Sequence, residues 1–217
     1  MRFRNRTEAG RLLARELEQY AGRDHVVVLA LPRGGVPVGY EVAKALVAPL
    51  DVFVVRKLGV PGHRELAMGA IATGGLIVLD HDLVSRLGIP EEVIRRAIAD
   101  ELHELERREA AYRGDRGQAQ LEGKTVILVD DGLATGATMR AAVLAVRERN
   151  PARVIVAVPV AAAQTCDRLR GDVDELICAL TPESFYAISI WYDDFSQTSD
   201  EEVRGLLARA ATDDSSR

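Results

Sequence analysis

The chain has 217 residues, of which 47% are hydrophobic, and a formal net charge of −5. This length fits one domain, and the acidic balance argues against general nucleic-acid binding, which normally needs a basic face. No apolar run reaches the ~20 residues that span a membrane, and "MRFRNRTEAG" lacks the apolar stretch of a signal peptide. Because there are only two cysteines, Cys166 and Cys178, we expect reduced thiols and a cytoplasmic protein.

The first third of the sequence alternates helix and strand patterns. A helix is expected from a cap at Thr7 to about Tyr20, followed by a buried strand at "HVVVLAL" and a helix whose first turn holds Pro37. A second buried strand, "DVFVV", ends at Arg56-Lys57. The stretch "LGVPGHREL" is broken by Gly and Pro and predicts a long loop, with short strands at "MGAIA" and "LIVL" after it.

The middle of the sequence predicts a long surface helix from Pro90 to about Tyr112, within a helical insertion at about 80–117. Three further strands are expected at "TVILVD", "RVIVAV" and "VDELICAL". Helices at about 137–149 and 161–170 separate these strands. Strands that alternate with helices predict an α/β fold with a central parallel sheet flanked by helices.

The end of the sequence predicts a last helix that starts at Ser199, whose spacing to Glu202 is that of a capping box. Residues 211–217 are expected to form a disordered tail, which leaves a single domain at 1–210. Ligands of parallel α/β sheets bind outside the carboxyl ends of the strands. Three polar breaks, "PRGG", "RKLG" and "DDGLATGAT", follow such ends, and we expect them to converge.

The stretch "VILVDDGLATGAT" at 126–138 carries the strongest functional signal. A strand that enters a helix through small residues leaves backbone N–H groups unpaired at the helix N-terminus, where the helix dipole also favours an anion. A phosphate fits there, and Gly136 removes Cβ obstruction. The predicted phosphate loop consists of Gly132, Leu133, Ala134, Thr135, Gly136, Ala137 and Thr138.

The two carboxylates that precede this loop, Asp130 and Asp131, would repel a phosphate. We therefore expect them to face vicinal hydroxyls, a metal ion, or both, on the same ligand. A ribose 5-phosphate satisfies the whole stretch, with its phosphate on the loop and its hydroxyls on the carboxylates. The alternative is a turn at the strand end, in which an aspartate merely caps a helix.

An apolar strand, two acidic residues and a T-G-x-T loop together resemble the type I phosphoribosyltransferases, over about residues 26–160. The resemblance implies phosphoribosyl pyrophosphate (PRPP) as a ligand, with its pyrophosphate on "LPRGG" and on the basic step "RK". Glycines allow close backbone approach there, and an arginine supplies fixed positive charge. The implied pyrophosphate-binding residues are Arg33, Gly34, Gly35, Arg56 and Lys57, and the implied catalytic residues are Arg33, Lys57, Asp130 and Asp131.

Several of these assignments have alternatives. The alternative for Arg56-Lys57 is surface charge at a strand end. The segment "GVPGHRELAMGA" resembles the flexible loop that closes over the site, and His63 is the histidine in it. The aromatic segment "SFYAISIWYDDF", in a candidate base-binding hood at about 180–198, can stack on a planar base or pack as core.

Within the family, "VDDGLATGATM" and "RKLGVPG" look most like adenine phosphoribosyltransferases. Ala134 stands where the 6-oxopurine enzymes carry an acid, which weakens a hypoxanthine or guanine assignment. The adenine enzymes place a glutamate late in the flexible loop, however, and "AIATGG" contains none. The identity of the base therefore stays open.

The resemblance implies transfer of the phosphoribosyl group of PRPP to a nitrogenous base, with release of pyrophosphate, as in purine salvage. Mg²⁺ would be held mainly through PRPP or pyrophosphate, without a metal site made by the protein alone. A homo-oligomer such as a homodimer is expected, with no nucleic acid or membrane partner. Two alternatives remain: a non-catalytic regulator that binds PRPP or a nucleotide, and a hydrolase or phosphorylase acting on a ribosyl phosphate.

Overall fold

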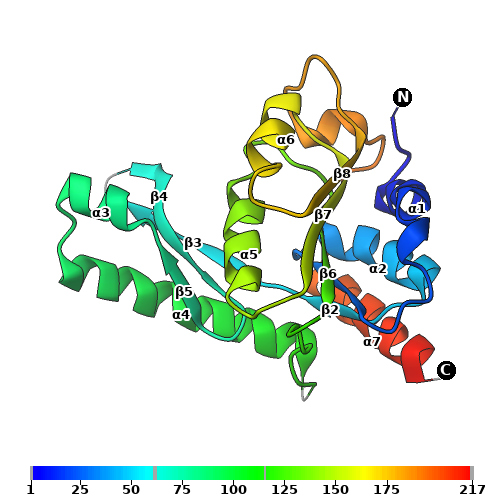
Figure 1. Cartoon of the computed structure of the whole chain (residues 1–217), viewed down its shortest axis with the longest axis horizontal. Helices are drawn as coiled ribbons and strands as arrows, with labels where there is room; N and C mark the ends of the chain where they lie inside the picture. Colours follow the sequence, from blue (N-terminus) through cyan, green and yellow to red (C-terminus); the bar gives the residue numbers. More distant parts are fainter. Residues whose placement is uncertain (1, 61–62, 115, 216–217) are drawn as a thin grey trace.

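The computed structural model describes residues 2–60, 63–114 and 116–215, and the side chains of 63–65 and 214–215 lie outside its description. A five-stranded sheet forms the centre (Figure 1), in the order β2-β1-β6-β7-β8 with every neighbouring pair parallel. The strands are β1 (Val26–Ala30), β2 (Leu50–Val52), β6 (Thr125–Val129), β7 (Arg153–Val160) and β8 (Glu175–Leu180). The predicted central parallel sheet is confirmed.

Helices cover both faces of this sheet, which explains why its central strands are apolar runs rather than alternating patterns. All five residues of β1 and of β6 are buried. Val28 and Ile127 face α1 (Arg6–Glu16) and α2 (Gly35–Leu46). Their neighbours Val27 and Val126 face α5 (Ala137–Arg147) and α6 (Ala163–Leu169).

A second sheet corrects the prediction for residues 53–79. It is antiparallel and contains β3 (Val55–Val60), β4 (His63–Ala72) and β5 (Leu76–Leu79). "DVFVV" is therefore no single strand of the central sheet, because only β2 pairs there, and the predicted loop is largely a hairpin. Leu58 and Val60 are buried on one side of β3, and this alternation stabilises a strand where Gly and Pro suggested a break. Residues 61–62 of that loop lie outside the described residues.

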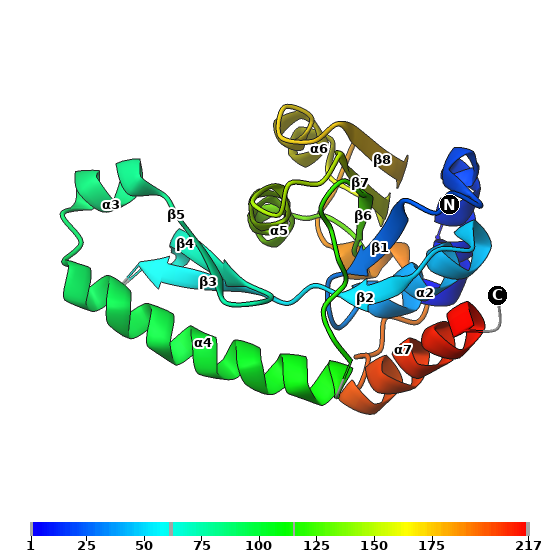
Figure 2. The same cartoon turned by 60° about the horizontal axis from the view of Figure 1, so that its bottom comes forward.

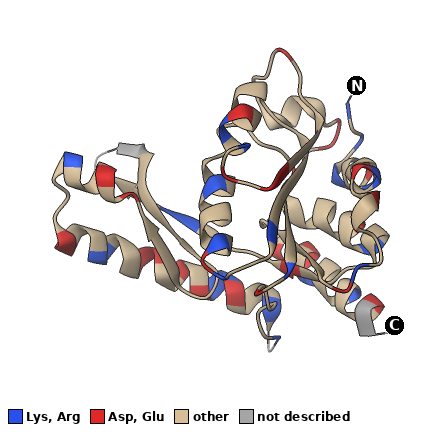
Figure 3. Ribbon diagram, viewed as in Figure 1, with Lys and Arg blue, Asp and Glu red and all other residues tan. Residues whose placement is uncertain are grey.

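An arm, which we define as residues 55–60 and 63–113, projects from the central sheet in Figures 1 and 2. It adds α3 (His81–Leu87), which the sequence did not predict, and α4 (Glu91–Arg113), which it did. Leu58 and Met68 of the small sheet share a core with Ile94 and Leu105 of α4. Figure 3 shows charges of both signs along α4, as expected for a helix with a solvated outer face.

One buried arginine, at the C-terminal end of α4, connects this helix to the central sheet. Arg113 Nε donates to Asp51 Oδ1 at 2.9 Å, and its Nη1 donates to Glu109 Oε1 at 2.7 Å. Asp51 lies in β2, the edge strand. Removing Arg113 would leave the largely buried carboxylates of Asp51 and Glu109 without their cation, so this network anchors the arm.

Both chain ends differ from the predictions. Asn5, not Thr7, caps α1, because its Oδ1 accepts from Glu8 N at 3.0 Å, and α1 stops at Glu16 before the 3₁₀ turn η1 (Glu18–Tyr20). Ser199 caps α7 (Asp200–Ser215) by accepting from Glu202 N at 3.1 Å, as the capping box predicted. The helix continues through 211–215, which corrects the expected tail there, while 216–217 lie outside the described residues.

Candidate active site

Two carboxylates stand at the carboxyl end of the central strand β6. Asp130 and Asp131 follow Val129 directly, and Asp131 N donates to Asp130 Oδ1 at 2.8 Å. Burial, together with the neighbouring Asp131 carboxylate, raises the pKa of Asp130 well above its usual value. Burial also raises the pKa of Asp131, although Arg6 opposes that rise. Such shifted acids at a strand end are typical of a functional site.

The loop after β1 lies against these carboxylates, because β1 is the parallel neighbour of β6. A Cβ atom on Gly34 would lie 2.0 Å from Asp131 Oδ2, and one on Gly35 would lie 2.7 Å from Val129 O. Glycine is therefore required at both positions for close approach, whereas the predicted approach of a pyrophosphate to this loop stays a prediction. The group that comes close is the strand end itself. The peptide between Pro32 and Arg33 is cis.

The predicted phosphate loop connects the carboxylates to α5. Gly136 has φ 73° and precedes the first helical residue, Ala137, so the first-turn N–H groups point out of the helix without i−4 acceptors. The loop is held from outside: Leu133 N donates to Val160 O at 2.9 Å, and Thr165 Oγ1 donates to Ala134 O at 2.5 Å. This geometry can hold an anion at the helix N-terminus.

A cavity of about 640 Å³ opens beside the phosphate loop, between the core and the arm. Asp130, Asp131 and Arg33 are not in its lining. It is lined by Lys57, Ala67, Gly69, Ala70, Val78, Leu79, Asp80, Thr135, Gly136, Ala137, Arg140, Ala141, Leu144, Thr165, Arg168 and Leu169.

The structure separates the two residues of the basic step, because neighbouring residues of a strand point to opposite faces. Arg56 turns to α4, where its Nε donates to Glu101 Oε2 at 2.7 Å. Lys57 is exposed on β3 and lines the cavity beside the phosphate loop. An ion pair within the arm thus accounts for Arg56, whereas the pyrophosphate role of Lys57 stays a prediction.

Arg33 does not line the cavity that Lys57 lines. Its Nη1 is 3.6 Å from Asp200 Oδ1, at the start of α7, and Tyr112 OH donates to the same oxygen at 2.8 Å. Burial and the bond to Asp200 raise the pKa of Tyr112 to about 12. Arg33 and Lys57 therefore do not line one cavity, and a pyrophosphate role for Arg33 requires it to leave Asp200.

One site residue escaped the sequence analysis. Arg6, in the first turn of α1, places Nε 2.9 Å and Nη2 2.8 Å from Asp131 Oδ2. Its Nη1 donates to Ser196 O at 2.7 Å, and its guanidinium lies 4.0 Å from the centre of the Phe195 ring. The side chains of Arg6 and Asp131 are only 12% and 11% exposed. No local pattern links them, since 125 positions separate the two residues.

The hood predicted at 180–198 contains the 3₁₀ turn η2 (Ile188–Trp191) and packs against the N-terminus. Tyr192 is 2% exposed, its ring centre is 5.4 Å from that of Phe3, and its hydroxyl donates to Asp131 O at 2.6 Å. Tyr192 is therefore core and positions the site backbone, so it is not free to stack on a base. Trp191 Nε1 is buried without a hydrogen-bond partner among the described residues. The side chain of His63 lies outside the description.

The described residues contain no group of three or more His, Cys, Asp or Glu side chains able to hold a metal ion. Within the described part of the chain, no helix is both long and apolar enough to span a membrane.

This arrangement of strand-end carboxylates and phosphate loop has relatives among known proteins. A family model described as "Phosphoribosyl transferase domain" matches residues 4–189. The chain belongs to the phosphoribosyltransferase family. The match covers the carboxylates, the phosphate loop and Arg6, and it stops just before Trp191.

Two relatives of this family member are similar over almost its whole length. A Mycobacterium tuberculosis protein provisionally named a phosphoribosyl transferase is 46% identical over 211 residues, which are 97% of this chain and 47% of that protein. The chain thus spans about half the length of the curated relatives it matches. The crystal structure of TT1426 from Thermus thermophilus has a TM-score of 0.88 and 42% identity, covering 96% of this chain and 99% of that one.

Proposed function

We propose that the protein transfers the phosphoribosyl group of PRPP to a nitrogenous base and releases pyrophosphate. One observation carries the proposal: the half-buried Asp130 and the buried Asp131 lie between a close-packed Gly34-Gly35 loop and the outward N–H groups at the start of α5. A phosphate on the α5 N-terminus and sugar hydroxyls on Asp130 and Asp131 satisfy both features at once. A turn in which an aspartate merely caps a helix would account for the N–H groups of α5, but not for two carboxylates at the strand end.

In the proposed reaction the bond between C1 of the ribose and the pyrophosphate oxygen breaks, and its electron pair leaves with the pyrophosphate. A bond from C1 to the base nitrogen forms, and the proton that this nitrogen loses passes to the departing pyrophosphate. Positive charge develops on the ribose, and negatively charged Asp131 and Asp130 stabilise it. Arg33 and Lys57 would neutralise the departing pyrophosphate, and the 3.6 Å pair of Arg33 with Asp200 is loose enough to be exchanged for it.

Mg²⁺ fits the proposal as an ion that arrives with the ligand. A cation between Asp131 and the sugar hydroxyls would compete with Arg6, which already pairs with Oδ2 of that carboxylate. Mg²⁺ readily keeps its waters and binds through substrate phosphates with one or two carboxylates, a role that Asp130 suits. Bound there, it would neutralise charge on the pyrophosphate.

The experiment is incubation of the protein with PRPP, Mg²⁺ and each nucleobase in turn, with pyrophosphate release as the readout. Adenine is the first candidate because of the resemblance of residues 129–139. Base-dependent release supports transfer. Tight PRPP binding without release supports a regulator. One observation favours this alternative: Asp131 pairs with Arg6 and Arg33 pairs with Asp200, so two groups that transfer would use already have partners. Release without any base would indicate a hydrolase.

A further inference from the structure

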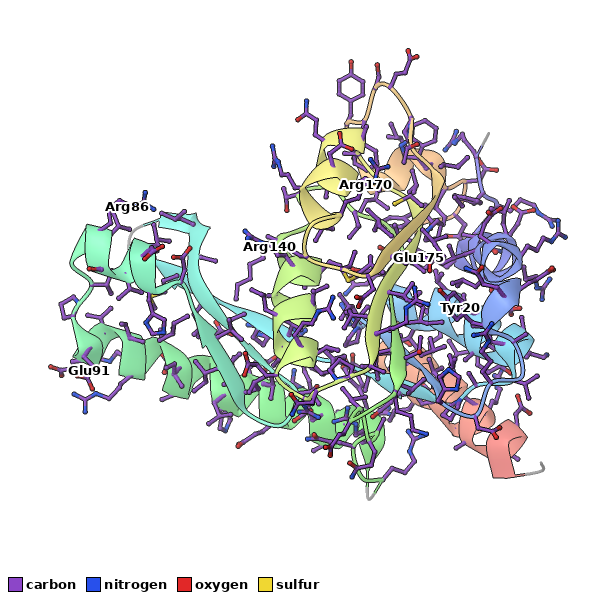
Figure 4. All side chains as sticks on the ribbon, in the orientation of Figure 1. Tyr20, Arg86, Glu91, Arg140, Arg170 and Glu175 are labelled. Atoms are coloured by element: carbon purple, nitrogen blue, oxygen red, sulfur yellow. The ribbon has the colours of Figure 1, made fainter. Side chains whose placement is uncertain are left out.

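Two thiols face each other between α6 and β8. Cys166 Sγ lies 3.1 Å from Cys178 Sγ. β8 is the last strand in the order of the central sheet (Figure 2), and successive residues of a strand point to opposite faces. Cys178 therefore packs on the α6 side, while its neighbour Ile177 packs on the α1 side. Figure 4 labels Arg170, directly after α6, and Glu175, the first residue of β8.

The geometry of this pair suits a disulfide. The sulfur atoms of a disulfide are about 2.05 Å apart, so the observed 3.1 Å has to shorten by about 1 Å. Both thiols are free, and the chain has no third cysteine that could compete for either of them. Cys166 is 2% exposed, whereas Cys178 is only partly buried on its edge strand. A small oxidant therefore reaches Cys178 first.

The start of α6 supports the phosphate loop. Thr165, the residue before Cys166, donates from Oγ1 to Ala134 O at 2.5 Å, and Ala162 N donates to Leu133 O at 3.1 Å. Thr165 is 3% exposed, so its side chain has little free space around it. Because close-packed interiors transmit strain, a displacement of Cys166 would be passed on to the Thr165 hydroxyl and to the loop.

We propose that Cys166 and Cys178 are a modification site, at which a peroxide forms a reversible disulfide that weakens ligand binding at the phosphate loop. The disulfide draws α6 and β8 together by their sulfur atoms. The bond from Thr165 Oγ1 to Ala134 O is then strained, and the loop loses one of its supports. Formation of the disulfide does not depend on what the protein binds, whereas its effect on PRPP rests on the proposed function.

The reaction balances with hydrogen peroxide as the oxidant. The Cys178 thiolate attacks one peroxide oxygen, the O–O bond breaks, and the departing hydroxide takes up a proton to become water. Cys166 then attacks the sulfur of the resulting sulfenic acid, the S–O bond breaks, and the second hydroxide leaves as water with the Cys166 proton. Burial, together with the Cys166 thiol, raises the pKa of Cys178, so an alkaline solution favours the first step.

The first test is intact mass after the reduced protein has been treated with hydrogen peroxide at about pH 8.5. The disulfide should lower the monomer mass by about 2 Da and protect both thiols from maleimide, and dithiothreitol should reverse both changes. Cys178→Ser is the matched control, because serine is similar in size and leaves Cys166 without a partner. Its mass should not fall. A parent monomer that keeps both thiols, or only gains oxygen, would overturn the proposal.

The second test is calorimetric titration of PRPP into the reduced, oxidised and re-reduced parent after the peroxide has been removed. The oxidised protein should bind PRPP ~5-fold more weakly, as for the loss of one hydrogen bond, and reduction should restore the affinity. Cys178→Ser should keep its affinity after the same treatment. Equal affinity of the reduced and oxidised parent would refute the effect on the loop. Absence of PRPP binding to the reduced parent would contradict the proposed function, while the mass measurement still decides the disulfide.

Discussion

Replacing Arg6 by methionine tests whether this residue holds the sugar carboxylate in place. The substitution keeps most of the side-chain stem but leaves Asp131 buried without its cation. Breaking a buried ion pair by removing one partner costs about 3–5 kcal/mol of unfolding free energy. For a protein of this size each kcal/mol lowers the melting temperature by about 2–4 °C, so we expect a fall of about 6–20 °C.

Thermal unfolding followed by circular dichroism measures this change, and Arg4→Met is its matched control. Arg4 lies two residues away, its side chain is 79% exposed, and it pairs only with Glu8 at i,i+4. Such a surface pair contributes less than about 1 kcal/mol. In a double-mutant cycle with Asp131→Asn, Arg6 and Asp131 should show a coupling free energy above about 1 kcal/mol. Equal losses for Arg6→Met and Arg4→Met, or no coupling, would refute the reasoning.

Three other predictions follow from the same geometry. Lys57→Met and Arg33→Met should each lower kcat about 100-fold with a smaller loss of PRPP affinity, and equal losses would mean that the charges act only in binding. Gly136→Val should abolish the thermal shift with ribose 5-phosphate and also lower stability, since φ is 73° and its Cβ would lie 2.6 Å from Thr165 Cγ2. The raised pKa of Asp130 contributes stability that is full below about pH 4 and is lost as the pH rises through the folded-state pKa. Denaturant titrations should therefore show a larger loss in the parent than in Asp130→Asn, where only Asp131, whose pKa is also raised, remains.

Sequence reasoning recovered what local chemistry determines. The runs at β1 and β6 predict buried strands, and Gly136 predicts the turn into α5, because both follow from local chemistry. That this turn binds a phosphate stays a prediction. Sequence reasoning was wrong where a contact between residues far apart in the sequence determines the position of a side chain. Arg56 and Lys57 look equivalent as a pair, but the strand directs Arg56 to Glu101 on a helix that packs only in the folded arm.

The same limit explains Arg6 and the chain ends. Nothing near Arg6 in the sequence indicates that its partner is Asp131, since the contact exists only after α1 and the hood pack around the end of β6. Tyr192 looked available for stacking until the N-terminal Phe3 covered it. Asn5 and Thr7 are both good caps, and only the backbone of the folded helix selects Asn5.

Calorimetric titration of PRPP with Mg²⁺ into the parent protein and into Asp130→Asn/Asp131→Asn tests the central claim most directly. The account predicts that the double variant folds with reduced stability, because Arg6 loses its buried partner, and that it loses at least ~10-fold in PRPP affinity. An unchanged dissociation constant in a folded double variant would contradict the assignment of the two carboxylates to the sugar.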